Sequence, residues 1–440
     1  MNEIRRPNNL DAYWMPFTAN RAFKEAPRML ARAEGIYYYT NDNREVLDGT
    51  AGLWCVNAGH GRREIVEAIQ KQAAILDFAP TYQLGHPIAF QAAAQLAEIL
   101  PDPLDRIFWT NSGSESADTA LKIALAYHRA RGQSQRCRLV GRERGYHGVG
   151  FGGMTVGGIG PNRRQFGAML PYADHLPHTH DLARAYTHGQ PEHGAHLADA
   201  LESMVALHGA DTIAAVMVEP VAGSTGVLVP PKGYLDRLRQ LCTKYGILLI
   251  FDEVITGFGR MGTNFGSERL GVCPDIMTMA KGLTNAAVPM GAVATTSEIY
   301  GTIVDGSPAG IELFHGYTYS GHPLAAAAAI ATMDLQRSDD LPARAAAIEP
   351  YWEHAVHSLR GLPNVIDIRN LGLIAGIELQ PRDGQPGDRG NRVFKRSFDD
   401  GVLVRQTGDI IALSPPLIVE TAHVDRIMET LTAAIRAEAA

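Results

Sequence analysis

Cysteine is scarce in this chain of 440 residues, which contains four. Cys55, Cys137, Cys242 and Cys273 lie far apart, and no two of them form a CxxC pair. A scaffold held by disulfide bonds and a zinc site built on paired cysteines are therefore both disfavoured. The pattern predicts a protein of a reducing compartment, and we expect a cytoplasmic location.

Long apolar runs and an excess of positive charge are also missing. No segment approaches the roughly 20 apolar residues that span a bilayer, and residues 1–7 lack the apolar stretch of a signal peptide. Forty lysines and arginines stand against 47 aspartates and glutamates, a formal net charge of −7. We therefore expect neither a membrane nor a nucleic acid as a partner.

The pattern that does recur is a short apolar segment followed by a helical one. Residues 213–218 and 247–251 are continuously apolar, and residues 234–245 between them have helical spacing. Continuous apolar runs of this length fit strands that are buried on both faces of a parallel sheet. The alternation predicts an α/β fold. Further strands are expected at 106–109, 138–140 and 291–295, and further helices at 63–76, 86–100 and 117–131.

An ionisable residue follows each of two apolar segments. Asp252 comes directly after 247–251, and Lys281 follows the segment 276–280. In open α/β sheets, ligands bind beyond the carboxyl ends of the strands. A buried lysine can form a Schiff base, and a buried aspartate needs a cationic partner. Pyridoxal phosphate meets both needs, because it offers an aldehyde to the lysine and a pyridinium nitrogen to the aspartate. A direct ion pair between Asp252 and Lys281 would explain the pattern equally well.

Other residues at the same expected edge fit such a cofactor. Ser112, Gly113 and Ser114 stand between a strand and a helix, where backbone N–H groups can bind a phosphate, although the turn could be a plain helix cap. Tyr146 could cover one face of a flat ring and Val254 the other, although a loop tyrosine often only packs.

Two more residues could bind a substrate. Arg405 follows an apolar strand near the C-terminus, and its guanidinium matches a carboxylate, although it could equally be a surface or interface arginine. Trp54 lies in a glycine-rich segment, 49–61, where it could line a pocket or belong to the core.

Histidines gather between residues 175 and 196. They have no regular metal-ligand spacing, so we expect a solvated loop and no metal site. They are His175, His178, His180, His188, His193 and His196.

The order of strands and helices changes near residues 325–340. The segments beyond predict an α+β unit, with a strand at 402–405 and a last helix at 421–438. We therefore expect three regions: residues 1–60 as an N-terminal arm and part of a small domain, residues 61–330 as a large cofactor-binding domain, and residues 331–440 as a C-terminal small domain.

Several motifs together resemble the class III, or ω-amino acid, pyridoxal-phosphate aminotransferases over nearly the whole chain. They are SGSE at 112–115, YHG at 146–148, VEP at 218–220, FDEVITGFGR at 251–260, AKG at 280–282 and HGYTYSGHP at 315–323. Four more are similar to the ω-amino acid:pyruvate, or β-alanine:pyruvate, group: WMPF at 14–17, GLW at 52–54, GIGPNR at 158–163 and DHLPHT at 174–179.

The resemblance implies fold type I, with a large domain whose mostly parallel sheet lies between helices and a smaller α+β domain. It implies a homodimer, or a tetramer, with active sites at the subunit interface, where Thr318 would reach the partner's cofactor. The implied cofactor contacts are Ser112, Gly113, Ser114, Tyr146, His147, Glu219, Asp252, Val254, Lys281 and Thr318. The implied substrate contacts are Trp54, Tyr82, Tyr146, Ser224 and Arg405, with Lys281 as the catalytic residue.

One position departs from part of this family. In 4-aminobutyrate and ornithine aminotransferases a glutamate follows the Glu-Pro glutamate by five residues, whereas this chain has Ser224. The departure favours transfer from an ω-amino acid or primary amine to pyruvate. The alternatives are a 4-aminobutyrate or diamine transaminase that uses 2-oxoglutarate, a racemase or decarboxylase on the same scaffold, and a non-catalytic relative.

Overall fold

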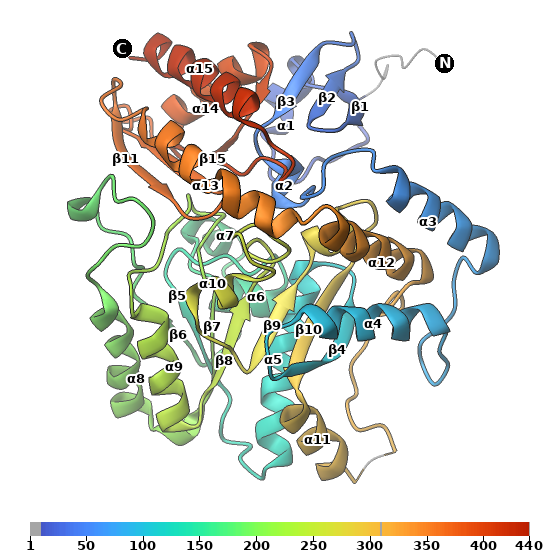
Figure 1. Ribbon diagram of the computed structural model, residues 1–440. Helices are drawn as coiled ribbons and strands as arrows, with labels where there is room; N and C mark the ends of the chain where they lie inside the picture. The colour runs from blue at the N-terminus through green and yellow to red at the C-terminus, as the bar shows by residue number, and fades with distance from the viewer. Residues whose placement is uncertain (1–9, 309, 440) are drawn as a thin grey trace.

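A seven-stranded sheet forms the centre of the computed structural model, which describes residues 10–308 and 310–439 (Figure 1). The strand order is β4-β10-β9-β8-β7-β5-β6. Strand β10 runs antiparallel to β4 and β9, and the other neighbours are parallel. The strands are β4 (Leu104–Thr110), β5 (Arg138–Arg142), β6 (Ala173–Leu176), β7 (Ile213–Val218), β8 (Leu248–Asp252), β9 (Ile276–Met279) and β10 (Gly291–Thr296).

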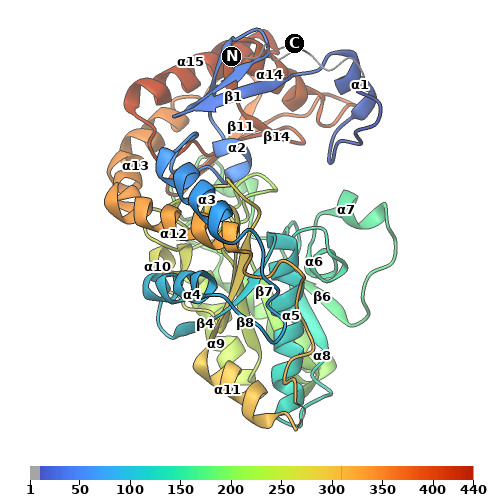
Figure 2. The ribbon, with the colours of Figure 1, turned by 90° about the vertical axis from the view of Figure 1, so that its right-hand side faces the viewer.

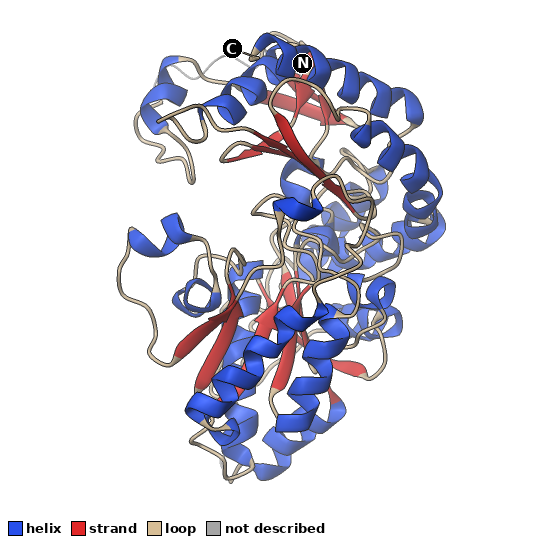
Figure 3. Ribbon diagram, turned by 90° about the vertical axis from the view of Figure 1, so that its left-hand side faces the viewer, coloured by secondary structure: helices blue, strands red, loops and turns tan. Residues whose placement is uncertain are grey.

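Helices cover both faces of this sheet (Figure 3), and the alternation of side chains along a strand explains why. In β8, Leu248 and Ile250 pack in one apolar cluster with α5 (Gly113–Ala130). Leu249 and Phe251 belong to the opposite cluster, with α8 (Ala200–His208) and α9 (Tyr234–Tyr245). A strand that is apolar on both faces is what the continuous run 247–251 predicted, and the prediction of an α/β fold is confirmed.

The two ends of the chain pack together beyond the carboxyl edge of the sheet (Figures 1 and 2). One four-stranded sheet has the order β1-β2-β3-β13 and the other β11-β12-β15-β14. Their strands are β1 (Leu30–Glu34), β2 (Tyr37–Thr40), β3 (Glu45–Asp48), β11 (Val365–Asn370), β12 (Ala375–Leu379), β13 (Val402–Leu403), β14 (Arg405–Thr407) and β15 (Ile410–Leu413).

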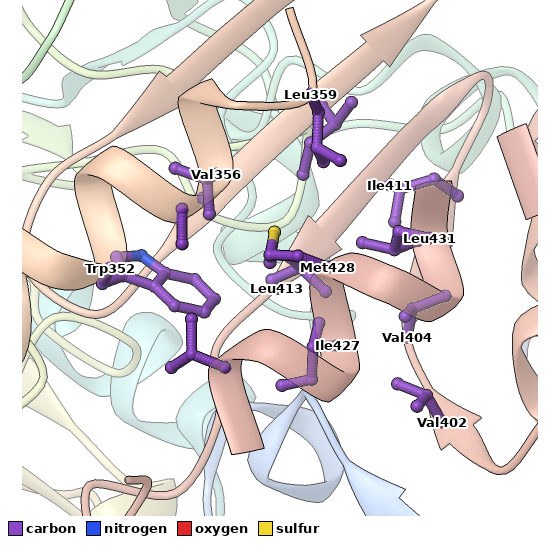
Figure 4. Packing of buried hydrophobic residues seen from close by; sticks show 14 of the residues in the cluster. Trp352, Val356, Leu359, Val402, Val404, Ile411, Leu413, Ile427, Met428 and Leu431 are labelled. Carbon is purple, nitrogen blue, oxygen red and sulfur yellow. The ribbon is translucent and has the colours of Figure 1, made fainter. Parts of the chain in front are cut away.

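The core of this part is an apolar cluster around Trp352, which is fully buried (Figure 4). Leu47 of β3 lies in the same cluster and pairs with Val402 of β13. Residues near the start of the chain therefore share a core and a sheet with residues near its end. This supports the proposed grouping of residues 1–60 with 331–440, although α12 (Pro323–Ser338) runs across the proposed boundary.

The remaining helices connect these layers. No helix among the described residues has the length and apolar character needed to cross a membrane. The α-helices are α1 (Asn20–Glu25), α2 (Ala51–Trp54), α3 (Arg63–Ile75), α4 (Pro87–Ile99), α6 (Phe151–Val156), α7 (Gly160–Arg164), α10 (Gly266–Leu270), α11 (Ser297–Gly306), α13 (Leu341–His357), α14 (Asp388–Asp399) and α15 (Thr421–Ala437). The short 3-10 helices are η1 (Leu182–Arg184), η2 (Ala195–Asp199), η3 (Ala210–Thr212) and η4 (Lys281–Thr284).

Two sequence predictions differ from the structure. The expected strand 402–405 is divided, because β13 pairs with β3 while β14, which starts at Arg405, pairs with β15. The histidine-rich segment begins inside β6, which pairs in parallel with β5 and so draws His175 into the sheet. Part of the remainder of that segment also lies against other elements, as described below.

Candidate active site

Parallel strands bring Asp252 and Lys281 to the same edge of the central sheet. Asp252 is the last residue of β8 and pairs with Thr278 of β9. Lys281 follows three residues later, where the chain leaves the sheet with a φ of 48°. Both side chains therefore stand beyond the carboxyl ends of buried strands, where α/β sheets bind ligands.

The Lys281 amine lies in a buried environment. Burial lowers its pKa to about 8, although the Cys55 thiol and Asp252 partly oppose that shift. Among the described residues, none forms a hydrogen bond or ion pair with this amine. The alternative of a direct Asp252–Lys281 ion pair is thus not what the structure contains. A desolvated lysine with a lowered pKa has a neutral fraction that can act as a nucleophile.

Asp252 is held by His147 instead. The Asp252 Oδ2 atom lies 2.8 Å from His147 Nδ1, and its Oδ1 accepts a hydrogen bond of 3.1 Å from the Val254 N–H. The aspartate is 6% exposed and the His147 ring is fully buried, with its Nε2 atom unpartnered in the described structure. The carboxylate is therefore fixed in direction, and its remaining lone pairs can bind a pyridinium nitrogen.

The helix α5 starts at the residues expected to bind phosphate. Ser112 is its N-cap, with a hydroxyl that accepts a hydrogen bond of 3.2 Å from the Glu115 N–H. The N–H groups of Gly113 and Ser114 in the first turn have no partner within the helix, so they can bind an anion. The helix-cap alternative is thus correct for the Ser112 side chain, and it leaves the backbone phosphate site intact.

Glycines allow close approaches on both sides of this turn. A Cβ at Gly113 would lie 3.1 Å from both methyl groups of Val254. Gly148 has a φ of 85°, and a Cβ there would lie 2.4 Å from the Ser114 hydroxyl, which also accepts a hydrogen bond from the Val149 N–H. These close approaches form a cradle between the helix start and the loop that carries Tyr146. The cradle, Asp252 and Lys281 fit pyridoxal phosphate.

Glu219 connects two loops at the site. Its Oε1 accepts a hydrogen bond from the Tyr146 N–H at 2.9 Å, and its Oε2 accepts one from the Gly223 N–H at 3.1 Å. Arg142, which the sequence analysis missed, donates to the Glu219 carbonyl at 2.8 Å. Burial raises the pKa of both Glu219 and Tyr146. Glu219 thereby fixes the loop of Tyr146 and the loop of Ser224, and Ser224 is itself buried.

Arg405 is a largely buried cation at the start of β14. Burial lowers its pKa, and the Tyr146 hydroxyl partly opposes the shift. Its Nε atom is buried without a hydrogen-bond partner, and no carboxylate of the described chain pairs with it. A buried guanidinium without a counterion is unfavourable, so this arrangement favours binding of an anionic group.

The remaining three predicted site residues differ in solvent exposure: Trp54 is buried, whereas Tyr82 and Thr318 are exposed. Trp54 is 2% exposed and packs with Val221 and Ile255, as expected for a core tryptophan. Tyr82 and Thr318 are both exposed. Their roles in the pocket and at a neighbouring subunit's phosphate remain predictions.

Part of the histidine-rich segment packs against other elements, so the expectation of a solvated loop is correct only for its exposed residues, which include His188, His193 and His196. His180 Nε2 lies 3.3 Å from Glu378, and Tyr186 donates to Val365 and Asp367 of β11. The Arg369 guanidinium lies between Asp367 and Glu378 and neutralises them. The acidic partners come from residues far along the chain, which is why local composition did not reveal them.

The model of the family described as aminotransferase class-III matches residues 18–435 of this chain. The chain is a class III aminotransferase. It is 66% identical to the omega-aminotransferase of Caulobacter vibrioides over 96% of this chain and 97% of the relative. It is 47% identical to the beta-alanine–pyruvate aminotransferase of Pseudomonas aeruginosa, over 97% of this chain and 96% of the relative.

Solved structures agree with this assignment. The omega transaminase of Pseudomonas jessenii in complex with PMP has a TM-score of 0.92 at 33% identity, over 97% of this chain and 96% of that one. An amine transaminase from an uncultivated Pseudomonas species in the PLP-bound form has a TM-score of 0.91 at 35% identity, over 98% of this chain and 99% of that one. The class III aminotransferase described here is therefore a pyridoxal-phosphate enzyme of fold type I, as predicted. The reading as a non-catalytic relative is not supported, because Lys281, Asp252 and the cradle are all in place.

Cys55 is a further residue that the sequence analysis did not place at the site. It appeared only as one of four dispersed cysteines, yet the structure brings its thiol into electrostatic reach of Lys281. Burial raises the pKa of this thiol, so it is a neutral group near the amine. Its position next to Trp54 in the GLW motif was the one available signal.

Proposed function

We propose that this enzyme moves the amino group of an ω-amino acid or a primary amine to pyruvate, which becomes alanine. The observation that carries the proposal is the buried Arg405 guanidinium, which has no carboxylate partner in the described chain. Ser224 occupies the position where a glutamate would neutralise it in 2-oxoglutarate enzymes. Arg405 is therefore available for the carboxylate of an acid-tailed substrate. The relative from Pseudomonas aeruginosa described above is named as a beta-alanine–pyruvate aminotransferase.

Different residues of the chain would bind different parts of the cofactor. When bound, pyridoxal phosphate supplies an aldehyde for the amine and a ring that delocalises electrons from the substrate carbon. The amides of Gly113 and Ser114 would bind its phosphate, and Asp252 would pair with the ring nitrogen. Tyr146 and Val254 would cover the two faces of the ring.

The reaction itself depends on Lys281 and Arg405. With a pKa near 8, the Lys281 amine can take a proton from the amine-bearing carbon of the substrate and return it at the carbon that carried the cofactor's aldehyde. Arg405 orients an acid-tailed donor or pyruvate by a bidentate contact.

We also propose a homodimer, or a tetramer of such dimers, located in the cytoplasm. Large apolar side chains are exposed on a single chain, including Phe90 at 72% and Phe314 at 80%. Exposed apolar surface of this kind is typical of a protein–protein interface. The four cysteines are free, which fits a reducing compartment.

An acceptor and donor panel tests the proposed activity. Purified enzyme is given β-alanine, 4-aminobutyrate, putrescine and each enantiomer of 1-phenylethylamine, with pyruvate or 2-oxoglutarate as acceptor. We expect alanine as the main product, with little glutamate. Preferential formation of glutamate would favour the 4-aminobutyrate or diamine alternative. Release of carbon dioxide, or racemised donor without transfer, would instead indicate a decarboxylase or a racemase.

A further inference from the structure

One carboxylate holds both ends of the loop formed by residues 48–60. Asp48 ends β3 and is fully buried. Its Oδ1 accepts hydrogen bonds from the Thr50 N–H at 2.9 Å and the Thr50 hydroxyl at 3.1 Å. Its Oδ2 accepts one from the Gly52 N–H at 2.7 Å and lies 2.8 Å from His60 Nε2. The donors come from the first residues of the loop and from its last residue.

His60 is fixed from outside the loop. Its backbone exchanges two hydrogen bonds with Gly35, at 2.7 and 3.0 Å. Its ring lies 4.3 Å from the Tyr38 ring, between centroids. The imidazole is therefore held by strand β2 and the turn before it, and it gives Asp48 a rigid contact.

The backbone between these anchors has an unusual conformation. The φ angles are 46° at Ala51, 66° at Gly52 and 64° at Trp54. Left-handed φ values are unfavourable for residues that carry a Cβ, and they persist where the surroundings fix them. The Thr50 hydroxyl also lies 2.8 Å from the Gly52 carbonyl, so its single proton is shared between that oxygen and Asp48. The contacts with Asp48 therefore select this shape.

The loop shares a cavity with Arg405, the residue proposed to bind the substrate carboxylate. Thr50, Gly52 and Leu53 line a cavity of about 480 Å³ that Arg405 also lines. The next residues lie on the side of the cofactor-binding residues, since Trp54 packs against Val221 and Ile255, which are close in sequence to Glu219 and Val254. The charge of Lys281 also acts on the pKa of the Cys55 thiol and lowers it, against the effect of burial. One short loop thus extends from the carboxylate-binding arginine to the reacting lysine.

We propose that Asp48 and His60 are positioning residues, which fix the loop 48–60 as the apolar wall that binds carboxylate-free, bulky amines. The inference rests on the proposed function, because it concerns which donors that site accepts. An acid-tailed donor is anchored by Arg405 on β14, outside the loop. An aromatic amine lacks that anchor and depends on Leu53 and its neighbours. Loosening the loop should therefore affect the aromatic amine more.

The test compares His60→Leu with His60→Gln and His357→Leu. Leucine cannot donate to Asp48, whereas the glutamine amide can. His357 is a matched control, because it is also a buried histidine with a side-chain hydrogen bond, to Asn370, and it lies in the C-terminal part of the chain. We measure kcat and KM for 1-phenylethylamine and β-alanine with pyruvate, together with cofactor absorbance and Tm.

For His60→Leu, we expect the kcat/KM ratio of 1-phenylethylamine to β-alanine to fall about tenfold, a change typical of a shifted substrate-positioning group. His60→Gln should restore the ratio to within about threefold, and His357→Leu should leave it unchanged. An unchanged ratio in His60→Leu, or a parallel loss for both donors together with bound cofactor, would overturn the proposal.

Hydrogen exchange gives a second readout that does not depend on catalysis. Peptides that cover residues 50–55 should exchange faster in His60→Leu than in the wild type, while peptides from β7 should not change. If His60→Leu does not fold, the nearly isosteric Thr50→Val removes two of the loop's contacts and decides the question by the same two measurements. Failure of wild-type transfer to pyruvate would overturn the proposed function alone, because the exchange experiment still tests the loop.

Discussion

At the scale of single residues, Lys281 predicts how activity and stability depend on pH. Its pKa is lowered from 10.5 to about 8 by burial, so the folded chain holds this proton less tightly than the unfolded chain. The resulting cost to stability is full below pH 8 and is removed as the pH rises toward 10.5. More directly, the amine must be neutral to attack the cofactor's aldehyde.

We therefore predict that the cofactor-free enzyme combines with pyridoxal phosphate faster as the pH rises, with a midpoint near 8. Stopped-flow absorbance from pH 6.5 to 9.5 measures this rate. Lys281→Ala should not give the visible absorbance of cofactor bonded to lysine, while Lys244→Ala, a change at an exposed lysine, should behave as the wild type. A rate independent of pH in this range would contradict the assignment.

Arg405 should separate substrates by charge. Arg405→Ala removes the guanidinium, and we expect kcat/KM for β-alanine to fall about 100-fold, because a charge-assisted hydrogen bond contributes roughly 1.5–3 kcal/mol. The value for 1-phenylethylamine should change little. Arg405→Lys keeps the charge without the bidentate geometry, so it should recover part of the loss. Steady-state kinetics measure both donors. Equal losses for the two donors would contradict a carboxylate-binding role.

Some site residues could be predicted from the sequence and others could not. Asp252 and Lys281 each follow an apolar strand, so their place at the sheet edge follows from local pattern alone. His147 belongs to a recognisable motif, but its bond to Asp252 joins residues 105 positions apart. The contacts of Cys55 depend on a loop whose left-handed backbone no periodicity describes.

At the scale of elements, the contact between α5 and the Tyr146 loop depends on Gly148, which has no side chain. Gly148→Ala would place a Cβ 2.4 Å from the Ser114 hydroxyl at a φ of 85°. We expect the free energy of unfolding to fall by about 2–4 kcal/mol, from strain and overpacking. The dissociation constant for pyridoxal phosphate should rise, because the first turn of α5 moves.

Gly132→Ala is the matched control for this change. Its φ is 73°, yet no atom of the described residues lies within 4 Å of its Cβ position, so only the backbone strain of about 1 kcal/mol applies. Denaturant titration measures stability, and fluorescence titration measures cofactor affinity. Equal losses of affinity in the two variants would show that the close approach to Ser114 does not matter.

Element boundaries were predictable where a local signal exists. The helix expected from residue 117 begins at Gly113, and the Ser112-x-x-Glu115 spacing of a capping box was the signal for its start. The continuous apolar run 402–404 predicts one strand ending at Arg405, because such a run carries no information about which strands it pairs with. Only the assembled fold shows that Val402 pairs with β3 and Arg405 with β15.

At the scale of the whole molecule, distant parts of the chain depend on one another. Arg369 donates to the Gly226 carbonyl at 2.8 Å, and so joins β11 to the loop that carries Ser224. Leu47 and Trp352 share one core. Such contacts follow from the topology of the fold and not from composition. The sequence therefore predicts an α+β unit near the C-terminus, but it does not predict that this unit contacts the histidine-rich segment.

The proposed dimer makes a prediction that only the whole assembly can test. If Thr318 reaches the partner's phosphate, the Lys281→Ala and Thr318→Ala chains should each have low activity alone. In a mixed dimer, one site combines an intact Lys281 with an intact Thr318 from the other chain. Random exchange should therefore restore about a quarter of the wild-type sites, since half of the dimers are mixed and one site in each is complete.

The two variants are unfolded together, refolded and assayed, with each variant refolded alone as the control. Thr318 is exposed on the single chain, and Tyr317 beside it contacts Thr119 and Glu115 on the first turns of α5. The segment is thus anchored near one phosphate site while its threonine side chain is free to extend outward. Recovered activity requires a site shared between two chains. No recovery, with dimers present by sedimentation, would place Thr318 in the site of its own chain. Full activity of Thr318→Ala alone would place Thr318 outside the site, and a monomer would remove the basis of the shared site altogether.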